Sequence, residues 1–199
     1  MRQLTNVKRM MNKFKWILLL FPLPAYASIQ CDHASWNDNL TQFNRLESNY
    51  NQYVETFNAL LTEHKQRQLL SQTFSPHELT LLWRAQTNQR AFHNQLETSI
   101  QYQRELTDKA NTLAKLSKES TWMANGWEKL ADKCEISDEK ANQISAEWYQ
   151  INASELAKDY TQLATQYLGL AQLYAKEASA LKYAQNVPQY PYSYWDCSL

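Results

Sequence analysis

The chain has little glycine and little proline, with only 2 and 5 of them among its 199 residues. Glycine supplies the turns of β-sandwiches and the phosphate loops of dinucleotide-binding enzymes, so its scarcity argues against both classes. Hydrophobic residues make up 44% of the chain, which is an ordinary share for a globular protein. The composition therefore predicts an all-α protein built from long helices.

No apolar run is long enough to cross a bilayer, because the longest, from Trp16 to Phe21, falls far short of the ~18–20 residues required. It lies within residues 1–27, which carry five basic side chains, no acidic one, and small residues at Ala25 and Ala27. This is the layout of a secretory signal peptide. We expect cleavage after Ala27 and a periplasmic or secreted protein; the alternative is an uncleaved anchor.

Basic charge is scarce in the expected mature chain. Removing residues 1–27 takes away 5 of the 20 basic side chains and none of the 20 acidic ones, which leaves a formal charge of about −5. A mildly acidic protein is a poor ligand for the phosphates of nucleic acids or of anionic membranes. We therefore expect no nucleic-acid partner.

Apolar residues recur at alternating steps of four and three, the heptad pattern of a coiled coil. The pattern predicts one helix over residues 33–72, a second beginning at Pro76, and a third over residues 138–186. Ser75, Pro76 and Glu78 have the spacing of a capping box, with proline at the first helical position. The second helix has a weaker stripe, which falters around residues 117–126, where Gly126 favours a kink.

Three long helices joined by short connections favour an elongated antiparallel three-helix coiled-coil bundle over residues 28–186, followed by a short extended tail over residues 187–199. An up-down-up order brings Cys31 and Cys134 to the same end, so we expect a disulfide between them in an oxidising compartment. A Cys31–Cys197 bridge is the main alternative. The third cysteine is then either free or a link between two chains.

The residues offer little for catalysis or for metal binding. The four histidines have no pair spaced three or four apart, as a helical zinc site needs, so we expect no metal and no cofactor. Cys31 lies two residues before His33, but a disulfide explains this cysteine better than a nucleophile does. Two carboxylates, Glu47 and Glu177, occupy predicted seam positions, where polar residues more often set the helix register. We expect no enzyme; a hydrolase using Glu47 or Glu177 is the least favoured alternative.

Aromatic residues are abundant, and those in the tail have no helical period. Prolines should keep this segment extended, so it either packs along the bundle or docks on a partner. Tyrosine and tryptophan are enriched in binding hot spots, and the predicted partner-binding residues are Tyr190, Tyr192, Tyr194 and Trp195.

We interpret the chain as an exported interaction or scaffold protein of an envelope or secretion assembly. Its expected partner is another envelope protein, or a second copy of itself, and the sequence indicates no small-molecule substrate. The alternative is a periplasmic holdase chaperone or a protein inhibitor, which would mask another exported protein.

Overall fold

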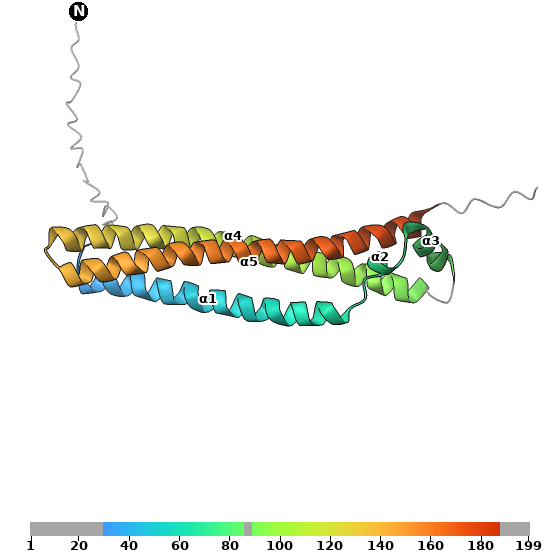
Figure 1. Ribbon diagram of the computed structural model, residues 1–199, viewed down its shortest axis with the longest axis horizontal. Coiled ribbons are helices and arrows are strands. Elements are labelled where there is room, and N and C mark those ends of the chain that lie inside the picture. The colour runs from blue at the N-terminus through green and yellow to red at the C-terminus, as the bar shows by residue number, and fades with distance from the viewer. Residues whose placement is uncertain (1–29, 86–88, 188–199) are drawn as a thin grey trace, which may run out of the picture.

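The computed structural model describes residues 30–85 and 89–187, and these residues form helices without any strand (Figure 1). The predicted all-α class is confirmed. The predicted signal peptide and the tail residues after Val187 lie outside the described residues. The helices are α1 (His33–Gln66), α2 (Leu70–Thr73), α3 (Pro76–Arg84), α4 (Gln89–Ile136) and α5 (Lys140–Asn186).

The two longest helices, α4 and α5, run antiparallel and pack against each other along the molecule (Figure 1). Hydroxyl groups of α4 tie the pair together in the middle. Ser117 Oγ donates to the Ala157 carbonyl at 2.8 Å, and Ser120 Oγ donates to the Ala153 carbonyl at 2.8 Å. Small residues on α5 allow this close approach, because a short side chain lets two helix backbones come together.

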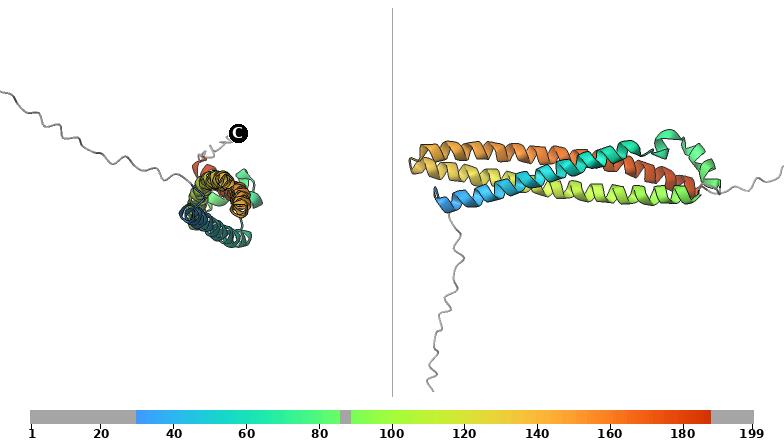
Figure 2. Two further views of the ribbon diagram at one scale, coloured as in Figure 1. Left: turned by 90° about the vertical axis from the view of Figure 1, so that its left-hand side faces the viewer. Right: turned by 90° about the horizontal axis from the view of Figure 1, so that it is seen from below.

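Helix α1 lies along the α4–α5 pair and crosses it at a shallow angle (Figure 2). Its contact with α5 is an aromatic ladder with a period of seven residues, the repeat of a coiled-coil seam. The rungs of the ladder are Tyr50–Tyr160, Phe57–Tyr167 and His64–Tyr174, with ring centroids 4.8–5.5 Å apart. These α5 tyrosines are buried.

The tyrosine hydroxyls of the ladder have partners on α1. Tyr160 Oη donates to the Leu46 carbonyl at 2.6 Å, and Tyr167 Oη donates to the Tyr53 carbonyl at 3.0 Å. Each ring therefore buries an apolar body and satisfies its polar group, as a buried tyrosine requires.

The first predicted helix was too long. Helix α1 ends at Gln66, and the backbone at Arg67 is extended. Gln68, which the predicted helix included, is exposed, whereas Leu69 is buried and only 3% exposed. Because the chain leaves the helix here, the backbone N–H groups of Leu70 and Ser71 point toward the buried carboxylate of Glu177.

The second predicted helix is interrupted. It begins at Pro76 with the predicted capping box, in which Ser75 Oγ accepts from the Glu78 N–H and the Ser75 N–H donates to the Glu78 carboxylate. Helix α3 then ends at Arg84 and α4 begins at Gln89. The break lets Leu79 and Trp83 fold against α4 and α5, where they form a second apolar cluster with Phe92, Leu96, Ala178, Leu181 and Ala184.

The weak stripe near Gly126 does not interrupt the helix, since α4 is helical from Gln89 to Ile136. A Cβ atom at Gly126 would lie 3.1 Å from Asn39 Oδ1 of α1. The close approach of this buried asparagine explains the glycine here. The third predicted helix begins two residues late, at Lys140, because Asp138 has a positive φ of 58° and Glu139 is the N-cap.

Among the described residues, no helix is both long enough and apolar enough to cross a membrane.

Candidate functional site

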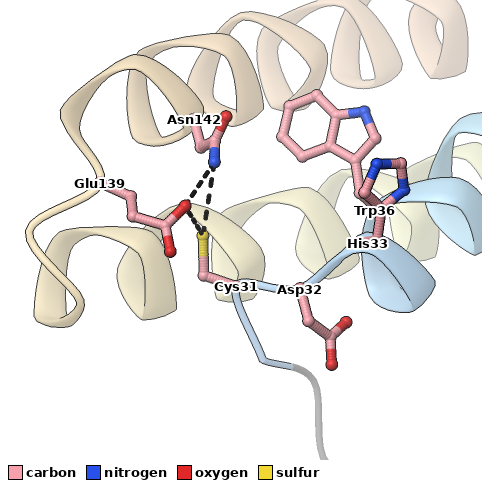
Figure 3. A pocket seen from close by; sticks show the side chains of 6 residues that line it. All are labelled: Cys31, Asp32, His33, Trp36, Glu139 and Asn142. Carbon is pink, nitrogen blue, oxygen red and sulfur yellow. Dashed lines mark hydrogen bonds between the residues drawn. The ribbon is translucent and has the colours of Figure 1, made fainter.

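The predicted disulfide between Cys31 and Cys134 is present and joins the start of α1 to the end of α4, with the Cα atoms 4.9 Å apart. It is consistent with an oxidising, extracytoplasmic location. A small cavity of about 360 Å³ opens beside it (Figure 3). Its lining consists of Cys31, Asp32, His33, Trp36, Glu139 and Asn142.

The two sulfurs of the bridge differ in accessibility. Cys134 is fully buried, so an external thiolate reaches the bridge only from the side of Cys31. On that side a carboxylate oxygen of Glu139 lies 3.3 Å from Cys31 Sγ, and Asn142 holds this carboxylate by donating to it (Figure 3). A fixed negative charge repels an approaching thiolate. The arrangement therefore protects the bridge and suits a structural disulfide.

The neighbouring Asp32 and His33 serve the start of α1. Asp32 is the N-cap, and its carboxylate accepts from the Ser35 N–H at 2.8 Å. This backbone hydrogen bond lowers the pKa of Asp32. His33 Nδ1 lies 3.2 Å from the side-chain amide of Asn37 and has no sulfur partner. The residues around Cys31 thus have local roles in capping the helix.

The two predicted seam carboxylates have opposite environments. Glu47 is exposed, and the buried seam position next to it belongs to Leu46, so the seam placement of Glu47 was wrong. Glu177 is completely buried, as its seam position predicted. Tyr160 contacts α1 near Glu47, and Glu177 lies 17 residues further along α5, roughly 25 Å away at 1.5 Å per residue. The structure therefore does not bring the two carboxylates together.

The Glu177 carboxylate is held by three donors. It accepts from the N–H groups of Leu70 at 2.9 Å and Ser71 at 2.8 Å, and from the Gln95 amide at 3.1 Å. These donors come from α2 and α4, so one carboxylate on α5 joins three helices. Its acceptor sites face backbone and amide donors of the protein itself, which is the geometry of a structural carboxylate.

A polar cluster lies beside the end of α1. Tyr102 Oη donates to the Glu63 carboxylate at 2.6 Å and accepts from Arg67 at 2.8 Å. The Arg67 guanidinium also lies over the Tyr102 ring, 4.4 Å from its centroid. Burial, reinforced by the bond to Glu63, raises the pKa of Tyr102 to about 12. The cluster fixes the position at which the chain leaves α1.

Metal-binding geometry is not found in the part of the chain that the structure describes. No group of three histidine, cysteine, aspartate or glutamate side chains there is placed to hold an ion. His64 meets Tyr174, with Nδ1 3.3 Å from the tyrosine hydroxyl. The expectation that the site holds no cofactor stays a prediction.

Helix α5 carries an exposed apolar stripe near the disulfide end that was not predicted from the sequence. We call Ile144, Trp148 and Ile151 of α5 the Trp148 face; they are 63%, 56% and 58% exposed. Their spacing of four and three places them on one side of the helix, opposite the buried Ala146 and Ala153. The spacing of these three residues could have predicted the stripe from the sequence, but the buried seam on the other side of α5 has a stronger apolar pattern.

A shallow groove of about 520 Å³ lies between α1 and α5, and we call it the α1–α5 groove. Its lining consists of Phe57, Asn58, Leu61, His64, Gln166, Gly169, Leu170 and Leu173. The predicted partner-binding residues Tyr190, Tyr192, Tyr194 and Trp195 lie outside the described residues. Among the surfaces of the described helices, the Trp148 face is the one that we consider further.

Comparisons with protein-family models, with curated proteins and with solved structures returned no match for this chain.

Proposed function

We propose that the protein is an exported interaction or scaffold protein of an envelope assembly, and that the Trp148 face contacts another envelope protein. The observation that carries the proposal is the exposure of three large apolar side chains on one stripe of α5. A contiguous apolar surface on a folded chain marks an interaction site more often than scattered apolar residues do.

The composition of the face supports a binding role. Tryptophan is among the residues that dominate binding energy, and apolar neighbours such as Ile144 and Ile151 exclude water from such an anchor. The Trp148 ring rests edge-on against Tyr149, with the ring centroids 4.9 Å apart, and Tyr149 in turn stacks on the buried Trp127. The anchor is therefore supported from beneath and held on a rigid helix, which lowers the entropy lost on binding.

The export route and the finer architecture belong to the same proposal. The disulfide fits an oxidising compartment, and residues 1–27 have the layout of a signal peptide. We propose that α1, α4 and α5 form an antiparallel three-helix coiled coil. The seven-residue period of the aromatic ladder supports this packing.

The proposal is tested by crosslinking in the native envelope with a photoreactive amino acid at position 148. A matched control places the same group at Thr121, which is exposed on α4 outside this face. We expect a specific adduct to one other envelope protein from position 148 and none from position 121, with the adduct reduced when Ile144 and Ile151 are replaced by serine. Adducts to many unrelated proteins would favour the chaperone function instead. Adducts to a second copy of the chain would indicate a homo-oligomer. The same adducts from both positions would show that the Trp148 face is not a specific binding surface.

A further inference from the structure

We propose that the Trp148 face binds a basic amphipathic helix of the partner protein, and that lysine or arginine side chains of this helix pair with acidic residues beside the face. This inference rests on the proposed function and names the chemistry of the partner. It follows from where the chain carries its negative charge and from where its apolar side chains are exposed.

The negative charge of the chain is concentrated at one end of the molecule. We define the disulfide end as residues 31–44 and 128–147, which contain eight acidic and three basic side chains, a formal charge of −5. In the rest of residues 28–199, twelve acidic and twelve basic side chains cancel. The eight carboxylates of the disulfide end are all exposed, and they belong to Asp32, Asp38, Glu128, Asp132, Glu135, Asp138, Glu139 and Glu147.

Ion pairs within the protein leave this charge in place. Those found among the described residues all lie outside the disulfide end, and they are Arg45–Glu119, Arg67–Glu63 and Lys158–Glu155. The field of the eight carboxylates therefore extends into solvent over about a Debye length, where it attracts a partner of positive charge.

Exposed apolar side chains gather at the same end. Of the eight large apolar side chains that are exposed among the described residues, five lie between residues 122 and 151, namely Trp122, Ile136, Ile144, Trp148 and Ile151. These residues lie within about 21 Å of the α4–α5 turn, at 1.5 Å per residue (Figure 1). Helix α4 alone is 48 residues, or about 72 Å, long. The apolar surface and the negative charge thus share less than a third of the molecule.

An acidic stripe on α4 borders α5. Glu128, Asp132 and Glu135 follow one another at steps of four and three, so they lie on one side of the helix. Glu128 and Glu135 come 11 and 18 residues after Ser117, close to three and five whole turns, so they share its side of α4. Ser117 contacts α5 on that side, because its hydroxyl oxygen lies 2.9 Å from that of Thr161. The stripe therefore runs along the edge of α4 that adjoins α5.

Glu147 connects this stripe to the Trp148 face. It comes 14 residues before Thr161, nearly four turns, and so lies on the side of α5 that adjoins α4. It is also three residues after Ile144 and four before Ile151, which makes it a direct neighbour of the face. We call Glu128, Asp132, Glu135 and Glu147 the acidic margin.

The acidic margin determines which occupant suits the face. Like charges spaced three and four apart disfavour a helix, and a basic partner would turn this repulsion into attraction. A second copy would bring its own charge of −5 to the contact, and an anionic lipid surface would repel this end in the same way. A helix suits the shape, since a straight stripe with steps of four and three packs against the same stripe of another helix.

Peptide binding to the full-length protein tests the proposal. The probes are two synthetic helical peptides of about 18 residues, long enough to form a helix. They share one leucine stripe, and their remaining positions are lysine in one peptide and glutamate in the other. The test variant, with Glu128→Gln, Asp132→Asn and Glu135→Gln, removes the stripe of charge. The matched control, with Glu97→Gln, Glu105→Gln and Asp108→Asn, removes three exposed charges from the other half of the same helix.

We expect the native protein to bind the lysine peptide at least about tenfold more tightly than the glutamate peptide, measured by fluorescence anisotropy of labelled peptide. The test variant should lose about tenfold in affinity for the lysine peptide, the size expected of three exposed ion pairs. The control should lose less than about twofold. Equal losses in the two variants, equal affinities for the two peptides, or no binding of the lysine peptide would overturn the proposal.

Crosslinking from position 148 in the native envelope separates this inference from the proposed function. We expect the three neutral substitutions of the test variant to reduce the adduct. An adduct of unchanged yield would retain the face as a contact site and overturn the basic partner. A tenfold peptide preference without any adduct would instead reject the proposed function and support the preference for a basic helix.

Discussion

At the scale of single residues, burial distinguishes two glutamates that the heptad pattern treats alike. After Phe43 a step of four reaches Glu47 and a step of three reaches Leu46, and both steps fit a coiled-coil seam. The structure takes the step of three, because burying leucine is favourable and burying an unpaired carboxylate is costly. Glu177 can be buried because α2 and α4 supply hydrogen-bond donors to its carboxylate. The apolar pattern of the sequence predicts neither the position of α2 nor the start of α4.

Replacing Glu177 by glutamine should destabilise the protein by about 1–3 kcal/mol. Leu70 and Ser71 donate to different oxygens of the carboxylate, so the amide group puts a donor opposite the N–H group of one of them. Glu47→Gln is the matched control, since the same chemical change at an exposed position should stay within about 0.5 kcal/mol. Urea denaturation followed by circular dichroism measures both. Equal effects from the two variants would contradict the structural role of Glu177.

At the scale of elements, the helices follow from the sequence more reliably than their ends do. The apolar period locates α5 to within two residues, and the capping box locates the start of α3. The end of α1 is set by tertiary contacts that no local pattern contains. Arg67 leaves the helix where Tyr102, 35 residues away, can accept from its guanidinium, and Leu70 turns toward Glu177.

The aromatic ladder between α1 and α5 should make the protein sensitive to alkali. Burial raises the pKa of Tyr167 to about 12, and the pKa of Tyr160 is raised for the same reason. Because the folded state holds these protons more tightly than the unfolded state, whose tyrosines titrate near 10, the stabilisation is present below about pH 10 and is lost as the pH rises toward 12.

We therefore expect the thermal unfolding midpoint to fall steeply between pH 10 and 12, with the tyrosinate absorbance of the ladder appearing only as the protein unfolds. The variant Tyr167→Phe is less stable at pH 8, by about 1 kcal/mol for the lost hydrogen bond, but should show a shallower loss above pH 10. A midpoint in the native protein that is independent of pH across this range would mean that the ladder tyrosines are not held in their protonated form.

At the scale of the whole molecule, one covalent bond and one long seam hold α1 in place. The disulfide joins residues 103 apart in the sequence, so it restricts the unfolded chain strongly. The pairing was predictable because an up-down-up order of helices brings both cysteines to one end. The Trp148 face was not predicted, since an outward stripe of three residues looks like surface variation until the buried side of α5 is known.

Breaking the bridge with Cys31→Ser should lower the free energy of unfolding by roughly 2–5 kcal/mol. Cys31 is the better position for this change because it is partly exposed, whereas Cys134 is fully buried and its loss would leave a cavity. Urea denaturation gives the free energy, and a chain with Cys197→Ser serves as the control with its bridge intact. A Cys31→Ser variant as stable as the control would show that the seam alone holds α1.

The position of this bridge also decides how the molecule bears mechanical load. Cys31 lies at the start of α1, and Cys134 lies at the α4–α5 turn. A pull applied between residue 30 and that turn is therefore carried by the sulfur–sulfur bond and does not stretch α1. Once the bond is reduced, the same pull passes through α1 and separates it from α5 one rung at a time, starting at the aromatic pair of Trp36 and Tyr149. With the bond intact, this end of the bundle therefore stays closed under such a pull, and with the bond reduced we expect it to open.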